Sequence, residues 1–224
     1  MSVTGVIGIS SGEMVRHASF YDELTYVDRP EGTIVSHVIA PLVHESRNQI
    51  AEKALTVGAE WVWYVDDDHS FHADTLMRLL AWDVSIVSGL YLRRTYPFKP
   101  VLYEHTDDNG EVMKSNFTPE DVGLKSVLAT GAGCLLVRTP VFKALRPPYF
   151  RFTNTENGGI LGEDIDFCRR AREKSFPVYC DFDTPVGHKT TITLYPNRES
   201  VGKWSVRVID LAGKTFGRGP MEAV

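Results

Sequence analysis

Three adjacent aspartates, Asp66, Asp67 and Asp68, follow an apolar run at residues 61–65. That run is aromatic and β-branched throughout, which is typical of a strand buried on both faces of a sheet. In a parallel α/β sheet, ligands bind at the carboxyl ends of the strands. A divalent cation would relieve the repulsion among three neighbouring carboxylates. The triplet therefore predicts a Mg²⁺ or Mn²⁺ site completed by substrate phosphates and water. The alternative is a solvated turn or the N-cap of the next helix.

A second acidic pair, Glu163 and Asp164, follows Gly162 at the start of a predicted helix. The helix dipole stabilises carboxylates at this position, so a purely structural role is one interpretation. The other is that one of the two carboxylates acts as a general base. The sequence favours neither.

Two further features gain meaning from the predicted metal site. A lone histidine such as His188 is usually structural, but a metal site that needs ligands makes it a candidate. The small residues of Thr130-Gly131-Ala132-Gly133 would let a ligand approach the backbone closely. A tight turn explains that segment equally well. It is not a phosphate-binding Walker loop, because no Gly-Lys-Ser/Thr follows.

The elements that must position these residues alternate along the first ninety residues. Strands are predicted at 3–9, 35–39, 61–65 and 84–87, and helices at 44–56 and 73–82. Such alternation predicts an α/β fold with a mostly parallel central sheet flanked by helices. Between residues 97 and 130, two strand-like pieces (100–103 and 125–128) and a turn signal at Asp108-Asn109-Gly110 predict a small antiparallel excursion.

The remaining predicted elements continue to the last site residue. They are a strand at 134–137, a short helix at 140–145, a polar loop at 154–159, a helix at 163–174 and a strand at 178–180. After His188 the pattern weakens and predicts no element. No repeat or low-complexity linker divides the chain, so we expect one domain over residues 1–224.

Composition narrows the class of protein. The 224 residues are 43% hydrophobic and 24% charged, which predicts a soluble globular protein. The net charge of −5 argues weakly against binding nucleic acid by overall charge, although a local basic groove stays open. The odd cysteine count, without a CxxC pair, predicts buried free thiols. No apolar run approaches the ~20 residues that span a bilayer, so we expect a cytoplasmic protein that does not bind membranes.

These features, in this order, resemble the GT-A family of nucleotide-sugar glycosyltransferases. The resemblance covers roughly residues 6–188 and is carried by short motifs. Val65-Asp66-Asp67-Asp68 is similar to the family's DxD metal motif, and Ser46-Arg47-Asn48 to a segment one element earlier. The glycine-bearing segment at 130–133 is similar to one beside the acceptor cleft. Residues 162–164 resemble the segment that carries the base in inverting members, and His188 falls where some members have a third metal ligand.

The resemblance implies a role for each of these acidic residues. Asp68 would bind Mn²⁺ or Mg²⁺, with Asp66 sharing the metal or contacting the ribose, and His188 would complete the protein ligands. Asp164 would take the proton of the acceptor hydroxyl while Glu163 orients the acceptor, or the two would exchange roles. Inversion of the anomeric centre follows only by analogy.

The resemblance also implies contacts with the donor. Residues 1–95 would bind the nucleotide and residues 96–190 the acceptor. The nucleotide-sugar would contact residues from four segments, namely Ser10, Ser11, Arg47, Asp66, Asp67, Gly131 and Gly133. The loop at 154–159 would close over the bound donor and exclude water.

The acceptor is less defined than the donor. The chain is short for the family, so a large partner surface is expected rather than an enclosed small molecule: a protein, a glycan or a modified DNA base. Compact soluble members of this kind occur in bacteria and bacteriophages. Arg93, Arg94 and Lys99 would suit a local phosphate contact, but the preferred interpretation is a solvated loop.

Three other functions stay open. A sugar-phosphate nucleotidyltransferase would need a glycine-rich basic loop near the N-terminus, where this chain has the small and acidic Ser10-Ser11-Gly12-Glu13. A metal-dependent phosphodiesterase or nuclease would use the carboxylates to hold two ions and would cleave without a sugar donor. A binding module without turnover would bind the donor and transfer nothing.

Overall fold

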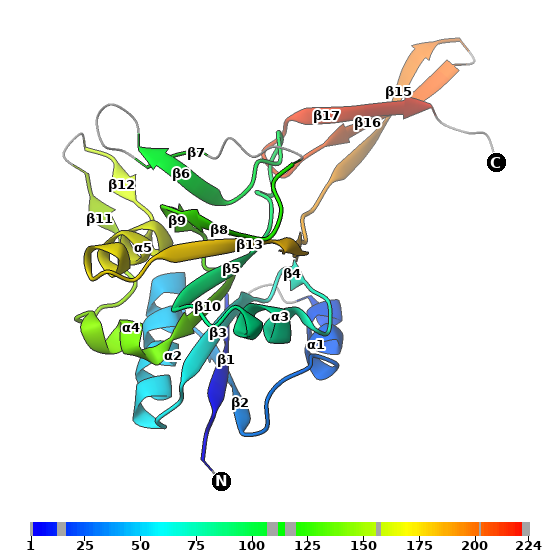
Figure 1. Cartoon of the computed structure of the whole chain (residues 1–224). Coiled ribbons are helices and arrows are strands. Elements are labelled where there is room, and N and C mark those ends of the chain that lie inside the picture. Colours follow the sequence, from blue (N-terminus) through cyan, green and yellow to red (C-terminus); the bar gives the residue numbers. More distant parts are fainter. Residues whose placement is uncertain are drawn as a thin grey trace.

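The computed structural model describes residues 2–12, 17–106, 112–114, 120–155, 158–201 and 203–220. A seven-stranded sheet forms its centre (Figure 1). Its strands, in spatial order, are β2 (Thr33–Ile39), β1 (Gly5–Ser11), β3 (Trp61–Asp66), β10 (Cys134–Arg138), β5 (Ile86–Leu90), β13 (Val178–Pro185) and β8 (Leu124–Val127). Only β10 and β8 run antiparallel to the strands beside them. The predicted mostly parallel sheet is confirmed, and it is consistent with a Rossmann-like fold.

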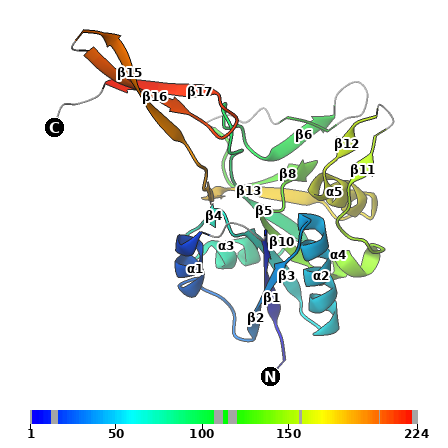
Figure 2. The ribbon, with the colours of Figure 1, turned by 180° about the vertical axis from the view of Figure 1, so that it is seen from behind.

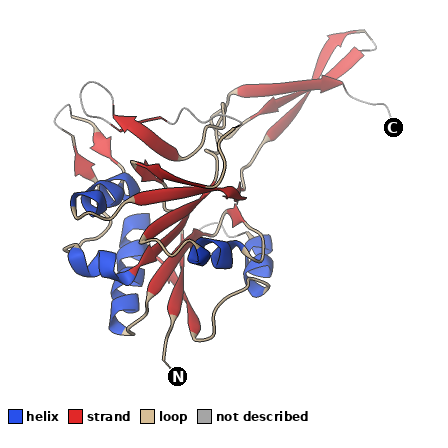
Figure 3. Cartoon of the chain, viewed as in Figure 1, coloured by secondary structure: helices blue, strands red, loops and turns tan. Residues whose placement is uncertain are grey.

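Helices cover both faces of this sheet (Figure 3). One face carries α2 (Val43–Thr56), α4 (Thr139–Ala144) and α5 (Glu163–Glu173), and the other carries α1 (Ala18–Thr25) and α3 (Thr75–Ala81). Side chains of β3 alternate between the two cores. Val62 and Tyr64 pack on the α2 side, whereas Trp63 and Val65 pack on the α3 side. The strand is buried on both faces, which explains its unbroken apolar run.

A glycine sets how closely α2 approaches the sheet. A Cβ on Gly8 of β1 would lie 2.5 Å from Ile50 Cγ2, so only glycine fits there. The close packing brings the first turns of α2 to the strand ends at which the aspartate triplet lies. Helix α3 begins at Thr75 with Asp74 as its N-cap residue. The triplet is therefore not a helix cap, and that alternative interpretation is wrong.

One predicted piece of the antiparallel excursion, at 100–103, overlaps β6 (Leu102–Thr106), which pairs with β7 (Val112–Lys114) and β9 (Ala129–Thr130) in a separate antiparallel sheet. The other piece, at 125–128, instead lies mostly in β8, at the edge of the central sheet. The turn predicted at residues 108–110 lies outside the described residues. The predicted loop at 154–159 joins a short pair, β11 (Thr153–Asn154) and β12 (Ile160–Leu161), and its residues 156 and 157 also lie outside the description.

Beyond His188 the chain forms a three-stranded sheet that the sequence pattern does not predict. Strands β15 (Thr193–Ser200), β16 (Lys203–Ile209) and β17 (Thr215–Pro220) project from the body as an arm, seen from both sides in Figures 1 and 2. Most described residues of β15 are exposed. The helix α1 was likewise not predicted.

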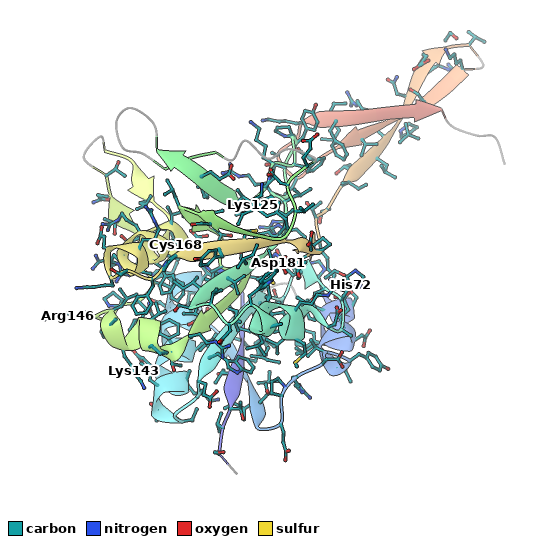
Figure 4. The ribbon with its side chains drawn as sticks, in the orientation of Figure 1. His72, Lys125, Lys143, Arg146, Cys168 and Asp181 are labelled. Atoms are coloured by element: carbon teal, nitrogen blue, oxygen red, sulfur yellow. The ribbon has the colours of Figure 1, made fainter. Side chains whose placement is uncertain are left out.

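The three cysteines are buried and free, as predicted. Cys168 lies on α5 (Figure 4), and its thiol donates a hydrogen bond to the carbonyl of Thr130 at 3.7 Å. Burial raises the thiol pKa of Cys134 to about 11 and of Cys168 to about 12, which suppresses thiolate chemistry. Within the described part of the chain, none of the helices has the length and apolar character needed to cross a bilayer.

Candidate functional site

Two parallel strands bring their polar ends to one edge of the sheet. Asp66 is the last residue of β3 and is paired in register with Ser10 of β1. Ser11 follows on β1, and Asp67 and Asp68 follow β3 directly. The strand-end rule thus holds for the predicted serines and aspartates, which gather at the carboxyl edge.

A cavity of about 290 Å³ opens at this edge. It is lined by Ser10, Ser11, Gly12, Ala40, Pro41, Val43, Ser46, Asp66, Asp67, Asp68 and Arg94. The Oγ of Ser10 is buried and has no hydrogen-bond partner among the described residues, so a ligand in the cavity would satisfy it. A larger cavity of about 590 Å³ lies near the end of α5, beside Arg169 and Arg172, and contains none of these carboxylates.

A directed hydrogen-bond chain closes one side of the cavity. The Ser11 hydroxyl donates to Asp67 Oδ2 at 2.6 Å, because a carboxylate only accepts. The same hydroxyl oxygen lies 2.8 Å from His37 Nε2, which must therefore donate to it. His37, on β2, was not predicted from the sequence, since an isolated histidine in a strand carries no signal of its own.

Asp68 lies within a group of possible metal ligands completed by two histidines. Strand β4 (His69–Ser70) pairs with β14 (Gly187–His188), with His69 directly opposite His188. The two imidazoles stack with ring centroids 4.5 Å apart. One potential ligand atom from each of Asp68, His69 and His188 lies within 4.8 Å of the others. His188 was predicted here, whereas His69 was not, although it follows the triplet immediately.

The hydrogen bonding of the two histidines suits a cation. His188 Nδ1 donates to the Leu92 carbonyl at 2.7 Å, which in the neutral ring leaves the Nε2 lone pair facing Asp68 Oδ2 at 3.3 Å. His69 is 1% exposed and neither of its ring nitrogens has a hydrogen-bond partner among the described residues. Its Nδ1 lies 3.2 Å from Asp68 Oδ1, without hydrogen-bond geometry. Unsatisfied nitrogens and a facing carboxylate fit a metal ion.

Charge at Asp68 is strongly favoured. Burial alone would raise the pKa of this carboxyl, but the interactions of Asp68 with the neighbouring rings of His188 and His69 outweigh it and hold the pKa far below its usual range. Conversely, burial would lower the pKa of His188, and its interaction with Asp68 raises it overall. Arg94 adds a further positive charge, with Nη1 2.9 Å from Asp68 Oδ2. Arg94 is exposed, as the solvated-loop interpretation expects, and it also lines the cavity.

The buried side chain of Arg47 bridges the two acidic segments, at Asp66 and at Glu163. Its Nη2 donates to both oxygens of Asp66, at 3.1 and 2.9 Å, and its Nη1 donates to Glu163 Oε1 at 2.5 Å. The side chain is only 4% exposed, and it does not line the 290 Å³ cavity. Burial would lower the pKa of Arg47, but the charges of Asp66 and Glu163 raise it overall. The structure thus places Asp66 on Arg47 and outside the group formed by Asp68 and the histidines.

Asp164 has the electrostatics of a general base. Burial, followed by the charge of Glu163, raises its pKa to about 6, while Arg47 acts in the opposite direction. Its Oδ1 accepts a hydrogen bond from the Ile165 amide at 2.8 Å. Its charge also raises the pKa of the buried Tyr91, after the effect of burial itself. The Asp164 carboxylate does not line the cavity.

The predicted site glycines, Gly131 and Gly133, leave space that side chains of the protein itself occupy. A Cβ on Gly131 would lie 2.0 Å from the Tyr91 hydroxyl, and one on Gly133 would lie 2.5 Å from His69 Cε1. The Gly133 amide donates to the Tyr91 hydroxyl at 3.1 Å, and the Gly133 carbonyl accepts from the Asp66 amide at 3.0 Å. Because Gly133 has no side chain, the His69 imidazole can lie against its backbone.

Comparison with known proteins gives a likeness of fold. No protein-family model and no curated protein sequence matches the chain. Among solved structures, A197 from STIV matches with a TM-score of 0.52 and 12% identity, over 99% of this chain and 97% of that one. GalNAc-T7 with UDP, GalNAc and Mn²⁺ matches with a TM-score of 0.54 and 12% identity, over 84% of this chain and 44% of that one. The second is a glycosyltransferase, and the chain spans less than half of its length.

Proposed function

We propose that the protein is a metal-dependent glycosyltransferase of the GT-A type, which moves a sugar from a nucleoside-diphosphate sugar to an acceptor hydroxyl. One observation carries the proposal: the group formed by Asp68, His69 and His188 lies at the strand edge where Ser10 and Ser11 line a cavity. The likeness of fold to GalNAc-T7, whose structure holds UDP, GalNAc and Mn²⁺, supports this assignment.

Two imidazoles and one carboxylate would hold the ion. Mg²⁺ prefers oxygen ligands, whereas imidazole suits transition metals, so this set favours Mn²⁺ over Mg²⁺. When bound, the ion would neutralise negative charge that develops on the departing nucleoside diphosphate. Asp66, expected to share the metal, is assigned instead to fixing Arg47. The ligand atoms would be one carboxylate oxygen of Asp68, one unpaired ring nitrogen of His69 and one ring nitrogen of His188.

Asp164 is proposed as the base. With a pKa raised to about 6 it is mostly a carboxylate at pH 7, yet basic enough to accept a proton from the acceptor hydroxyl. Glu163 is less suited, because its carboxylate is bound to Arg47. The acceptor oxygen would form the new glycosidic bond as the bond to the diphosphate breaks, with the acceptor proton passing to Asp164. A single displacement of this kind inverts the anomeric centre.

The nucleotide end of the cavity would be built by Ser10, Ser11 and Asp67. Ser10 Oγ is free to bind a ligand, and the chain from His37 through Ser11 holds Asp67 in one orientation. Arg47 was expected to contact the nucleotide. Its burial between two carboxylates assigns it to organising the site.

We further propose that the protein is cytoplasmic and forms one domain, in which residues before 96 bind the donor and residues after it bind the acceptor.

Donor binding tests the proposal directly. Thermal unfolding is followed against UDP-, GDP-, ADP-, CDP- and TDP-sugars, each with Mn²⁺ and with chelator. A ligand that binds only the folded state raises Tm, by an amount that corresponds to about 2.7 kcal/mol at one hundred times its Kd. We expect one nucleotide-sugar to raise Tm only with Mn²⁺, and to be hydrolysed slowly when no acceptor is present.

Two other outcomes would favour the alternative functions. Cleavage of phosphodiesters without a donor, together with no change of Tm with any donor, would favour the phosphodiesterase. Donor binding without hydrolysis or transfer would favour the binding module.

A further inference from the structure

The net charge of the chain hides a local concentration of basic residues. Residues 93–99 and 189–220 together carry nine basic and two acidic residues, a net charge of +7. The remainder of the chain carries 15 basic and 27 acidic residues, a net charge of −12. Such asymmetry is typical of proteins with a polyanionic partner.

The two basic segments are in contact at the base of the arm. Asp210, in the turn between β16 and β17, accepts a hydrogen bond from the Tyr96 amide at 2.7 Å. Phe216 of β17 contacts Phe98 edge to face, with ring centroids 4.9 Å apart. The segments therefore form one basic surface, which we call the arm surface, defined by residues 93–99, the strands β15, β16 and β17, and the turn at residues 210–214.

Within this surface, Arg207 has the surroundings of an anion-binding residue. It lies on β16, the middle strand of the arm, and forms no ion pair with the residues that the structure describes. Its Nε is buried without a hydrogen-bond partner there. A bound anion would satisfy this group.

The two acidic residues of the arm offset only part of this charge, and two further basic residues, Arg94 and Lys189, pair with carboxylates of the body. Asp210 accepts hydrogen bonds from the amides of Ala212 and Lys214 as well as that of Tyr96, so it stabilises its own turn. Glu199 pairs with Lys203 at 3.2 Å. Lys99 is exposed and forms no ion pair in the described part of the chain.

An aromatic ring accompanies the unpaired guanidinium. Tyr195, 46% exposed, is paired with Arg207 in the register of β15 and β16, and the guanidinium lies 5.2 Å from the ring centroid. Basic side chains beside exposed aromatic rings bind single-stranded nucleic acid by combining phosphate contacts with base stacking. A lipid headgroup would use the basic residues alone, and the aromatic partner favours a nucleic acid.

We propose that the arm surface binds nucleic acid through its phosphate backbone, with single strands preferred. The surface reaches the metal-ligand group, because Arg94 belongs to residues 93–99 and contacts Asp68. A bound strand would consequently lie beside the cavity. The inference does not require the transferase activity, since the binding rests on the arm alone.

Binding is tested by fluorescence anisotropy, with a fluorescein-labelled single-stranded DNA oligonucleotide and its duplex, in chelator and without any sugar donor. The test variant is Lys99→Gln/Arg207→Gln/Lys214→Gln. The matched control is Lys53→Gln/Lys143→Gln/Lys174→Gln, which changes the net charge equally at exposed positions of the body. Lys143 lies on the side of the body away from the arm in Figure 4. Neither triple variant alters a residue of the proposed site.

We expect the wild type to bind the single strand, with an affinity that falls between about 50 and 200 mM salt. The plot of log K against log salt has a negative slope. Its magnitude should decrease by about three in the arm variant and stay unchanged in the control. The single variant Lys99→Gln, outside the arm strands, should lower the slope by about one even if the triple variant misfolds. No binding at about 50 mM salt, equal losses in both triple variants, or binding only to anionic phosphatidylserine vesicles would overturn the proposal.

Discussion

The guanidinium of Arg94 and the imidazole of His188 meet at a single carboxylate oxygen. Arg94 Nη1 lies 2.9 Å and His188 Nε2 3.3 Å from Asp68 Oδ2. They come from segments almost a hundred residues apart, joined here by the hydrogen bond between His188 and the Leu92 carbonyl. A metal ion on Asp68 would therefore face the positive charge of Arg94.

Replacing Arg94 with glutamine should strengthen metal binding, because it removes a positive charge beside the ligand oxygens. Arg94 is partly exposed, so screening limits the gain to roughly three- to tenfold in Mn²⁺ affinity. Isothermal titration calorimetry without donor measures it. Arg93→Gln is the control, because the Arg93 side chain donates to the Tyr103 hydroxyl instead. An unchanged or weaker affinity would show that Arg94 does not oppose the ion.

Removing the Asp68 carboxylate should abolish metal-dependent donor binding and leave the fold intact. In Asp68→Ala we expect Mn²⁺ affinity to fall by more than about 100-fold, beyond the loss typical of outer residues that only orient ligands. Calorimetry with Mn²⁺ and Tm shifts with donor provide the measurement, and Asp22→Ala on the exposed face of α1 is the control. Unchanged donor binding, or an unfolded variant, would count against the assignment.

A methyl group at Gly133 should displace His69. The added Cβ would lie 2.5 Å from His69 Cε1, and the imidazole is buried with little room to retreat. We expect Gly133→Ala to weaken Mn²⁺ binding by at least about tenfold, since a displaced ligand costs at least as much as a displaced outer residue. Gly12→Ala meets nothing within 4 Å and should bind Mn²⁺ as the wild type does. Equal affinities in the two variants would remove His69 from the metal site.

Arg47 should be required for stability. Its removal leaves the buried carboxylate of Glu163 and the partly buried one of Asp66 without their partner, and breaking a buried pair of this kind costs about 3–5 kcal/mol. Urea unfolding of Arg47→Gln should show that loss, whereas Arg78→Gln, at an exposed pair on α3, should leave the midpoint unchanged. A stability loss as small as that of the control would mean that the guanidinium does not join the two segments.

Local patterns were sufficient to predict the body of the fold. The apolar run at 61–65, the amphipathic helix before it and the turn residues between them determine a strand–helix alternation whose strands end at one edge. That rule also brings Ser10 to Asp66 without any knowledge of tertiary contacts. His69 and the bridging role of Arg47 depend on partners more than a hundred residues away, at His188 and Glu163, for which the local sequence carries no signal.

The arm was missed for a different reason. Strand β15 is exposed on both faces, and such a strand needs no alternation of apolar and polar residues, so the pattern after His188 is weak. The same region carries a local basic surplus that the total of −5 conceals.

Asp164→Asn should separate activity from stability. A raised pKa means that the folded protein prefers the protonated acid, so ionised Asp164 destabilises the fold at neutral pH. The stabilising contribution of this group is complete below the unfolded pKa near 4 and is lost as the pH rises through about 6. Asparagine keeps the neutral shape and the acceptor for the Ile165 amide. We expect the variant to gain about 1–2 kcal/mol in free energy of unfolding at pH 7, less than the full shift because the side chain is partly exposed.

The same substitution should eliminate transfer while donor binding persists. In the wild type, kcat/KM should fall below about pH 6, where the base becomes protonated. Urea unfolding at pH 4 and pH 7 measures the stability difference, which should shrink at the lower pH, and Asp166→Asn is the contrasting variant. Asp166 is fully buried among Arg151, Arg169 and Arg170, and its pKa is lowered, so its loss should destabilise the protein at pH 7. An Asp164→Asn protein with full transfer activity would remove Asp164 from the role of base, whereas an inactive but less stable one would point to a structural role.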